Sequence, residues 1–450
     1  MPERSPDGHP GPPRGRELDR RILSLALPAL GALVAEPLFV LVDSAVVGSL
    51  GTGPLAGLAL ASTVLTTVVG LCVFLAYATT ATVARSLGAG DRRRALSLGV
   101  DGLWLALTLG VVLAVTLWTT APWLASALGA PEAALPHAVA YLRWSAPGLP
   151  GMLVVLAATG VLRGMLDTRT PLWVAATGAV ANAVLSVALV LGAGMGVAGS
   201  GLGTSLAQLG MATALGAVVV RGTRAAGVSL RPSVAGLRLG VRAGTPLLIR
   251  TVSLRLAILL AAWVAAGLGT VTLAGHQVVM ALWGLIAFGL DALAIAAQAL
   301  VGRSLGAGDV TATRAVLRRT LAWGTAAGAV AGAVLAAAGW WIAPLFTADD
   351  DVRRAVATTL VVVALTLPMA GWVFVLDGVL IGAGDGRYLA GAGMVTLVVY
   401  VPAALAARAW ADDGAGLLWS WVAFAGVFMA ARAVTTGLRA RGTAWMVAGA

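Results

Sequence analysis

Long apolar stretches alternate with short polar segments along the whole chain. Each of twelve stretches has about 20 residues or more, which is enough for an α-helix to cross the hydrocarbon core of a bilayer. The pattern therefore predicts an all-α, polytopic membrane protein. The predicted spans cover residues 23–48, 55–81, 97–118, 135–161, 172–193, 198–220, 241–266, 273–300, 320–342, 355–380, 388–407 and 415–437.

Composition supports the same class of protein. Hydrophobic residues make up 59% of the 450 residues and charged residues 11%, with a mean hydropathy of +0.93. A soluble domain has roughly 25% charged residues. The three histidines are scattered and no HExxH or GxSxG motif occurs. The sequence therefore shows no metal site and no catalytic constellation, and we expect a protein that is not an enzyme.

An internal repeat divides the chain into two halves. The sequence RSLGAGD occurs at Arg85–Asp91 and again at Arg303–Asp309, an offset of 303 − 85 = 218 residues, and the same offset aligns Pro28 with Pro246. Six spans per half is an even number, so both halves insert in the same orientation. We expect two six-helix lobes related by pseudo-two-fold symmetry about the membrane normal, as in carriers built from parallel repeats.

The repeat and the local composition predict five segments. Residues 1–20, rich in Pro, Gly and Arg, form a disordered cytoplasmic tail. Residues 21–220 form the N-terminal lobe and 241–437 the C-terminal lobe, joined by a basic, amphipathic linker at 221–240 that lies on the inner membrane surface. Residues 438–450 form a second cytoplasmic tail.

Arginine predicts the orientation in the membrane. All 30 basic residues are arginine, and the net charge is +11. Most lie in the tails and in alternate loops, whereas the loops of the other face hold Arg353, Arg354 and Arg408. The positive-inside rule then places both termini in the cytoplasm of a multi-pass protein of the cell membrane. Because the arginines are spread over short loops, we expect no nucleic-acid partner.

The repeated RSLGAGD follows spans 2 and 8. A phosphate loop would need a preceding strand and a following lysine, and neither is present. The favoured interpretation is structural: glycine ends one helix, aspartate caps the next, and arginine lies at the cytoplasmic interface.

Span 1 carries two acids inside the apolar region. Glu36 and Asp43 are 43 − 36 = 7 residues apart, which puts them on one helix face about 10 Å apart along the axis. Pro28 and Pro37 interrupt the hydrogen bonds of the same helix and allow it to bend. Burial favours the protonated form of a carboxyl group. Two acids on a bendable helix therefore indicate a proton-binding element, with structural hydrogen bonding as the alternative.

The repeat separates these acids from the shared scaffold. The C-terminal counterpart of Asp43 is Ala261 (43 + 218), and that of Glu36 is Leu254 (36 + 218). The N-terminal half is therefore predicted to carry the coupling site.

The C-terminal half has its own polar residues within spans. We expect Arg255 to pair with Asp291 or Asp377, and such a pair could be structural or could take part in transport. The candidates for this second polar site are Arg250, Arg255, Asp291, Asp377, Gln277 and Gln298.

Four motifs together resemble the multidrug and toxic compound extrusion (MATE) family, and most closely its DinF-type branch. They are PL..LVDSAVVG in span 1, RSLGAGD after span 2, GVLRG.LDTRTP after span 4 and LDGVLIGAGD after span 10. The resemblance extends from about residue 20 to 435. It implies a two-lobe transporter of twelve spans that exports organic, often cationic and amphipathic compounds in exchange for a cation.

The resemblance also implies roles for individual residues. The acid of span 1 in the family falls on Asp43, and the proline at which span 1 bends falls on Pro28. The polar cluster of related prokaryotic members looks matched by Tyr141, Asn182 and Thr204.

One acid of that cluster is missing. The family has an aspartate in span 5, but here Ser186 stands four residues after Asn182. A sodium site favours several oxygen ligands and negative charge, so proton coupling through Asp43 is the better prediction, with Glu36 as a candidate second acid.

We therefore expect an H⁺-coupled antiporter with no bound cofactor, working by rocker-type alternating access as a monomer in the lipid bilayer on a small organic substrate. Two alternatives remain open: Na⁺-coupled multidrug antiport, and flipping of a lipid-linked oligosaccharide by a member of the same superfamily.

Overall fold

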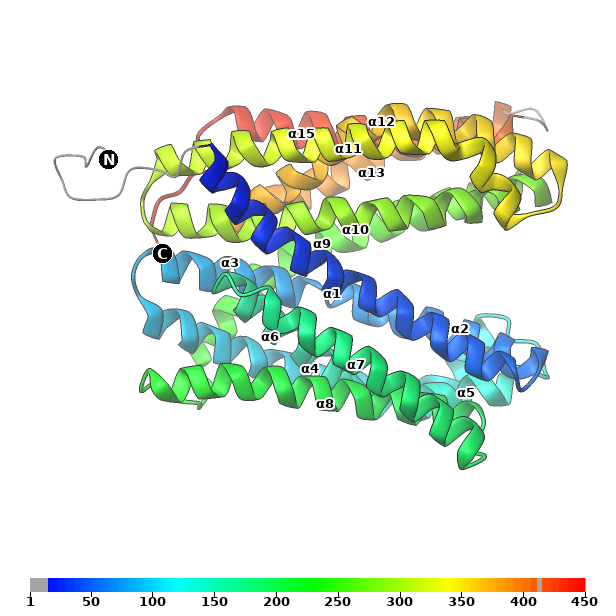
Figure 1. The fold of residues 1–450 in the computed structure, drawn as a ribbon, viewed down its shortest axis with the longest axis horizontal. Coiled ribbons are helices and arrows are strands. Elements are labelled where there is room, and N and C mark those ends of the chain that lie inside the picture. The colour runs from blue at the N-terminus through cyan, green and yellow to red at the C-terminus, as the bar shows by residue number, and fades with distance from the viewer. Residues whose placement is uncertain (1–14, 411–414, 450) are drawn as a thin grey trace. The chain divides into compact units, whose positions relative to one another are not determined.

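A computed structural model describes residues 15–410 and 415–449, apart from the side chain of Glu36. Over these residues the chain is helical and has no β-strand (Figure 1). Twelve helical segments are long and apolar enough to cross a membrane, and each contains most of one predicted span. The predicted all-α membrane fold is confirmed.

Eight of the spans are single helices and four include breaks or changes of helix type. The single helices are α1 (Arg16–Gly48), α4 (Arg92–Ala127), α8 (Val197–Ala225), α9 (Val234–Gly267), α10 (Thr270–Gly306), α11 (Val310–Phe346) and α12 (Asp350–Gly382), and α13 (Gly386–Trp410) is a further one next to the undescribed residues 411–414. The composite spans are α2 (Thr52–Leu71) with α3 (Phe74–Gly88); α5 (Leu135–Ser145), η1 (Ala146–Gly148) and α6 (Leu149–Gly164); α7 (Arg169–Val187) with the π-helix η2 (Ala188–Gly192); and α14 (Gly416–Trp421), the π-helix η3 (Val422–Phe428) and α15 (Met429–Arg441).

The RSLGAGD motif has the same structural role in both halves. Gly90 and Gly308 have φ of +79° and +74°, a backbone conformation that glycine adopts without strain. Asp91 then accepts a hydrogen bond from a backbone N–H in the first turn of α4, at 2.8 Å, and Asp309 does so in α11, at 2.7 Å. The structural interpretation of the motif, a glycine end followed by an aspartate cap, is confirmed.

Close helix packing repeats at the same offset. A methyl group on Gly160 would come closer than 3.0 Å to the carbonyl oxygen of Ala76, and one on Gly378 would do the same to Ala294. Both members of the second pair lie 218 residues after the first (160 + 218 and 76 + 218). The α3–α6 contact in one half and the α10–α12 contact in the other are therefore equivalent, and both depend on glycine for close approach of the backbones.

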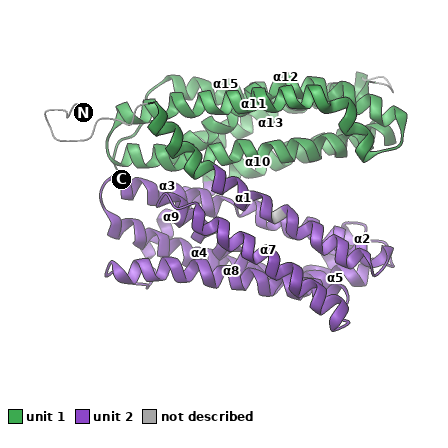
Figure 2. Ribbon diagram, in the orientation of Figure 1, with its two compact units in different colours: residues 1–26, 246–450 green, residues 27–245 purple. Residues whose placement is uncertain are grey.

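The helices form two compact units, coloured separately in Figure 2. Unit 2 comprises residues 27–245, and unit 1 combines the chain up to Ala26 with residues from Pro246 onward. The boundaries therefore do not fall in loops. They divide α1 just before Pro28 and α9 at Pro246, which are counterparts in the repeat.

The predicted linker and tails are more structured than expected. Helix α8 continues to Ala225 and α9 already begins at Val234, so much of the predicted linker 221–240 is helical. Helix α1 begins at Arg16, within the predicted tail 1–20, of which residues 1–14 lie outside the described chain. At the other end Trp445 is only 1% exposed and the backbone N–H of Gly449 donates to the Leu305 carbonyl at 3.0 Å, so the described part of the predicted tail 438–450 is attached to the protein at these two residues.

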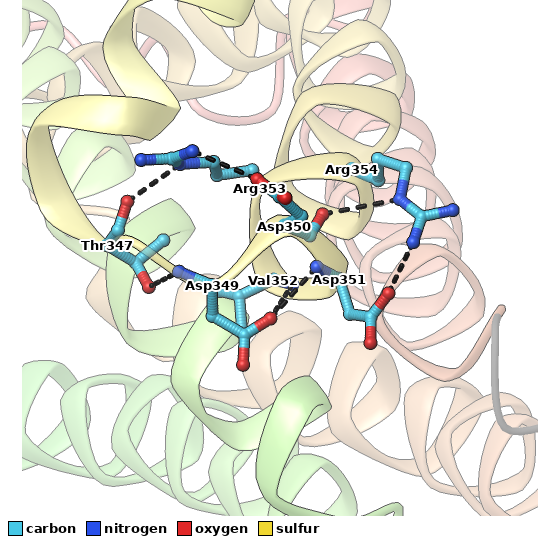
Figure 3. Close-up of polar contacts among 7 residues, drawn as sticks. All are labelled: Thr347, Asp349, Asp350, Asp351, Val352, Arg353 and Arg354. Carbon is cyan, nitrogen blue, oxygen red and sulfur yellow. Dashed lines mark hydrogen bonds and ion pairs between the residues drawn. The ribbon is translucent and has the colours of Figure 1, made fainter.

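The start of α12 neutralises its own arginines (Figure 3). Asp349 caps the helix by accepting backbone N–H groups of Asp351 and Val352 at 2.9 and 3.2 Å. Arg353 forms an ion pair with Asp350 at 2.9 Å, and Arg354 pairs with Asp351. Two of the three arginines expected on the face opposite the termini therefore add no net charge to their loop.

Glycine at position 328 gives a stability test of the helix packing in unit 1. A methyl group at Gly328 would collide with the carbonyl oxygen of Leu367 and with Pro368, whereas one at Gly391 would meet nothing within 4 Å. We expect Gly328→Ala to lower the free energy of unfolding by about 1–3 kcal/mol because two backbones must separate. Gly391→Ala, also inside a helix of unit 1, is the control. Thermal unfolding of the purified variants in detergent measures both, and equal midpoints would contradict the packing seen here.

Candidate functional site

Asp43 is the centre of a buried polar cluster in unit 2. The residue lies on α1 and is 3% exposed. One carboxylate oxygen accepts hydrogen bonds from the Ser186 hydroxyl at 2.6 Å and from the Asn182 side-chain amide at 3.3 Å, and the other accepts one from the Thr204 hydroxyl at 3.1 Å. Three side chains on two other helices therefore converge on one acid.

Helix geometry explains why these residues meet. Asn182 and Ser186 are four residues apart on α7, so they lie on the same helix face. Thr204 comes from α8, which packs against α7, and the buried Tyr141 of α5 interacts through its hydroxyl with both Asp43 and Thr204. Helix α7 passes into the π-helix η2 directly after the cluster, a feature that is frequent at functional sites. The structure thus brings together Asp43 and its four predicted neighbours.

Sequence reasoning missed Ser200. Its side chain is fully buried and interacts with Asp43, but its hydroxyl oxygen has no hydrogen bond of normal geometry. The signal was present, because Ser200 precedes Thr204 by four residues and therefore shares its helix face. The Oδ1 atom of Asn182 is likewise buried without a partner. The cluster therefore holds two polar atoms whose hydrogen bonding is incomplete.

No positive charge compensates Asp43. Among the described side chains, no ion pair includes Asp43, and its hydrogen-bond partners are all neutral. Burial disfavours the charged form of a carboxyl group, whereas donated hydrogen bonds favour it. Because Asp43 has no counter-ion, a change in its charge would leave no other buried charge unpaired.

The other predicted residues of span 1 are placed as follows. Pro28 and Pro37 both lie inside α1, which remains helical through both positions. The backbone of Glu36 is part of the same helix, but its side chain lies outside the described part of the structure. A role for Glu36 as a second acid stays a prediction.

A second buried polar cluster, in unit 1, differs from the predicted one. Asp377 forms an ion pair with Arg250 at 2.7 Å and a second with Arg432, and all three side chains are at most 12% exposed. Arg432 also lies against the ring of Phe374. Sequence reasoning placed Arg432 in span 12 but did not single it out, although a lone arginine within a span was the available signal.

The pairing expected through Arg255 is wrong. Arg255 lies on an exposed face of α9 and is in no ion pair among the described side chains, because α9 turns Arg250 rather than Arg255 towards α12. Gln277 is also exposed, while Gln298 is buried. Asp291 is half-buried and contributes to the charge environment of Arg432. The unit 1 cluster is thus built from α9, α12 and α15, with its carboxylate fully compensated.

The described residues contain no group of three or more His, Cys, Asp or Glu side chains arranged to hold a metal ion. The two clusters accordingly differ in kind. The cluster of unit 2 is one uncompensated acid among neutral donors, and the cluster of unit 1 is an acid held between two guanidinium groups.

Comparison with known protein families decides the identity of the fold. The MatE family profile matches the chain twice, over residues 28–188 and 246–405. The chain belongs to the MATE family. The two matches begin 246 − 28 = 218 residues apart, at the repeated proline, so each half is one copy of the family's unit. Members of this family are multidrug efflux transporters rather than enzymes, in agreement with the sequence analysis.

Relatives of this MATE protein occur in plants and bacteria. Protein DETOXIFICATION 44, chloroplastic, of Arabidopsis thaliana is 33% identical over 85% of this chain and 75% of its own length. DNA damage-inducible protein F of Escherichia coli K12 is 30% identical over 81% of each chain. A probable multidrug resistance protein NorM of Pseudomonas syringae is 29% identical over 94% of this chain and 95% of its own.

Solved structures share the fold. A MATE crystal structure in the bent conformation has a TM-score of 0.87 at 22% identity, over 95% of this chain and 96% of the other. An outward-facing multidrug resistance MATE transporter has a TM-score of 0.86 at 23% identity, over 95% and 96%. The predicted multi-pass architecture is therefore that of known MATE transporters.

The unit 1 cluster predicts a large effect of removing its single acid. Asp377→Ala leaves Arg250 and Arg432 buried without a counter-charge, so we expect the free energy of unfolding to fall by about 3–5 kcal/mol. Asp350→Ala, which removes the 82%-exposed partner of Arg353, is the control and should leave stability unchanged. Thermal or denaturant unfolding in detergent measures both. Equal stability of the two variants would show that the buried pair is not structural.

Proposed function

We propose that this MATE protein is a proton-coupled antiporter that exports amphipathic organic cations by rocker-type alternating access. The observation that carries the proposal is the state of Asp43, a buried carboxylate with neutral donors and no cationic partner. An intramembrane acid of this kind is expensive to keep charged and marks a proton or substrate pathway.

The neighbours of Asp43 can serve both of its protonation states. The hydroxyls of Ser186 and Thr204 donate to the carboxylate, and a hydroxyl can also accept a hydrogen bond when the acid carries a proton. The unpaired Oδ1 atom of Asn182 becomes a partner for a protonated Asp43 after rotation of its amide. Binding of a proton therefore rearranges hydrogen bonds instead of breaking the cluster.

The position of Asp43 connects the proton to a movable helix. Asp43 and both prolines lie on α1, and proline leaves unmade the backbone hydrogen bond that would resist bending. A change of hydrogen bonding at Asp43 alters how α1 packs on α7 and α8. Because linkage is reciprocal, a proton that lowers the affinity for substrate is itself bound less tightly when substrate is present. The result is exchange of protons for substrate across the membrane.

Ser186 favours the proton over sodium. Sodium prefers a site with several oxygen ligands and negative charge, and the position where related transporters have a second carboxylate holds a hydroxyl here. Sodium coupling is kept as the second candidate because Asp43, Thr204, Ser200 and the free Oδ1 atom of Asn182 offer oxygens in one place.

The protein is a multi-pass membrane protein, and we place it in the cell membrane with both termini in the cytoplasm. The support is the arginine distribution, strengthened by the local pairing of Arg353 and Arg354 on the opposite face. We also propose that it works as a monomer and without a bound cofactor, since the residues of each cluster all come from one unit of a single chain.

Replacement of the acid is the direct test. Asp43→Asn keeps the shape of the side chain but cannot exchange a proton, so we expect transport driven by a pH gradient to fall to background. The assay is efflux of a fluorescent organic cation from proteoliposomes under an imposed pH gradient. Glu132→Gln, which removes an exposed acid of the same unit, is the control and should transport normally.

Three other outcomes would each contradict part of the proposal. Undiminished pH-driven transport by Asp43→Asn would remove Asp43 from the coupling site. Transport by the native protein under a sodium gradient alone would replace the proton. Absence of transport under either gradient would favour a lipid-linked oligosaccharide as substrate.

A second carboxylate should change the coupling ion. Ser186 donates to Asp43 at 2.6 Å, so Ser186→Asp places two acids side by side and raises the negative charge offered to a cation. We expect this variant to gain transport driven by a sodium gradient, while Ser186→Asn, which is of similar size but uncharged, does not. Efflux under a sodium gradient at constant pH measures the change. Equal behaviour of the two variants would show that negative charge at this position does not select the ion.

A further inference from the structure

The first helix of each half is shared between the two units. Helix α1 has its beginning in unit 1 and the rest, including Asp43, in unit 2. Helix α9 begins in unit 2 and continues in unit 1. The changes of unit fall beside Pro28 and at Pro246, which occupy equivalent positions in the repeat. Each half thus sends the first segment of its first helix to the unit formed mainly by the other half.

A charged anchor holds the beginning of α1 in unit 1. Arg319 of α11 donates from Nε to one carboxylate oxygen of Asp19 at 2.6 Å and from a second nitrogen to the other oxygen. The indole N–H of Trp323 also donates to Asp19, at 2.7 Å. A two-pronged arginine–carboxylate contact fixes direction as well as distance. These residues are 300 and 304 positions apart in the sequence, so this is a tertiary contact and not a local one.

A carboxylate that accepts two hydrogen bonds, with no arginine partner, holds the beginning of α9 in unit 2. Asp101 of α4 accepts hydrogen bonds from the backbone N–H of Ser233 at 2.7 Å and from its hydroxyl at 3.0 Å, just before α9 begins. Trp104, on the same helix as Asp101, donates from its indole N–H to the Leu230 carbonyl at 2.9 Å. Gly236, in the first turn of α9, has no side chain to obstruct the Asp101 carboxylate.

The two anchors occupy the same place in the repeat. Arg319 is the counterpart of Asp101 (101 + 218), and in each unit a tryptophan about one helical turn later on the same helix makes a second contact. The chemistry differs, since one anchor is an ion pair and the other a carboxylate bound to a helix start. Equivalent positions on α4 and α11 therefore hold the incoming helix, although the residues at these positions differ.

We propose that Asp19 with Arg319, and Asp101 with Ser233, are positioning residues that fix the first segments of α1 and α9 on the opposite unit. Pro28 and Pro246 are then the positions at which α1 and α9 can bend where they pass from one unit to the other. A movement of the part of α1 that carries Asp43 is transmitted to unit 1 through the beginning of α1, which Arg319 holds. This role in transport rests on the function proposed above, whereas the anchoring itself does not.

The anchor on α1 is the one that can open. The side chains of Arg319 and Asp19 are 46% and 17% exposed, whereas Asp101 is 3% exposed. Exposed ion pairs are weakened by salt and by competing water, and buried contacts much less so. The anchor on α9 therefore acts as a fixed attachment, and the anchor on α1 as an adjustable one.

The first measurement is amide hydrogen exchange of the purified full-length protein in detergent, without substrate or gradient. Arg319→Ala should speed exchange in residues 15–26 roughly tenfold, since the segment loses a bidentate attachment. Arg21→Ala is the matched control, because it breaks the Glu17–Arg21 pair on the same helix, whose side chains are 56% and 59% exposed and four residues apart. Equal exchange in the two variants would overturn the anchor on α1.

The second measurement is transport in proteoliposomes. Arg319→Ala should lower turnover several-fold with substrate affinity unchanged within about twofold, because the binding residues are untouched and only transmission is lost. The double variant Asp19→Arg, Arg319→Asp re-forms the pair with its charges exchanged and should restore both slow exchange and turnover. Unchanged turnover in Arg319→Ala, or failure of the double variant to restore it, would overturn the positioning role.

The α9 anchor has its own variants. Ser233→Ala removes the hydrogen bond that the hydroxyl donates to Asp101 and the one it accepts from the Gly236 N–H, and it keeps the backbone contact to Asp101. Gly236→Ala places a methyl group where the Asp101 carboxylate lies. Both should speed exchange in residues 230–245, with Gly240→Ala, where the added methyl would meet only the end of the Leu105 side chain, as the control. If exchange responds as expected while Asp43→Asn still transports under a pH gradient, the anchors stand and the proposed coupling fails. Unchanged exchange in both variants would overturn the anchor on α9 whatever the coupling ion.

Discussion

The cost of placing a charge inside a bilayer is the constraint on which the polar architecture of this MATE protein depends. An ionised carboxylate at the centre of a span is unfavourable by about 2.5–3.5 kcal/mol on the insertion scale. Asp43 meets this cost with hydroxyl and amide donors from α7 and α8 and without a counter-ion. The helices around it are consequently arranged to present neutral donors, which leaves the charge of Asp43 free to change.

The two halves stabilise a buried carboxylate in different ways. The equivalent of Asp43 is Ala261, and the equivalent of Asp377 is Thr159 (377 − 218), so neither acid is part of the repeated scaffold. Asp377 meets the cost with two guanidinium groups. Such a compensated charge resists change of protonation, because removing one member leaves another unpaired. One unit therefore carries an adaptable charge and the other a fixed one, within helix packing that is otherwise equivalent.

The connection between the units follows from the same repeat. Each unit contains the first segment of the other half's first helix, and a residue at equivalent positions of α4 and α11 holds that segment. Proline marks the change of unit in both helices. In the proposed mechanism, α1 is attached at one end, can bend at a proline and carries Asp43 further along, so that a change of protonation at Asp43 is transmitted over several helical turns.

The sequence by itself determined the twelve membrane helices, the repeat and the central acid. Those features depend on local quantities: apolar length, the 218-residue register of RSLGAGD and the presence of Asp43 within an apolar span. Four neighbours of Asp43 were predicted through resemblance to a family. Ser200 shares a helix face with Thr204, so helical periodicity alone could have added it.

Only the tertiary structure decided which buried charges are partners. Hydropathy locates Arg250, Arg255 and Arg432 within spans but does not give the rotation of each helix, and that rotation turned Arg250 and Arg432 towards Asp377 and left Arg255 exposed. The Asp19–Arg319 pair spans 300 residues, and no local pattern predicts it. The sequence pattern likewise did not show how far α8 and α9 extend into the predicted linker 221–240. Membrane helices are specified one at a time by their own apolar length, whereas their ion pairs and anchors arise from side chains on several helices that meet only after packing.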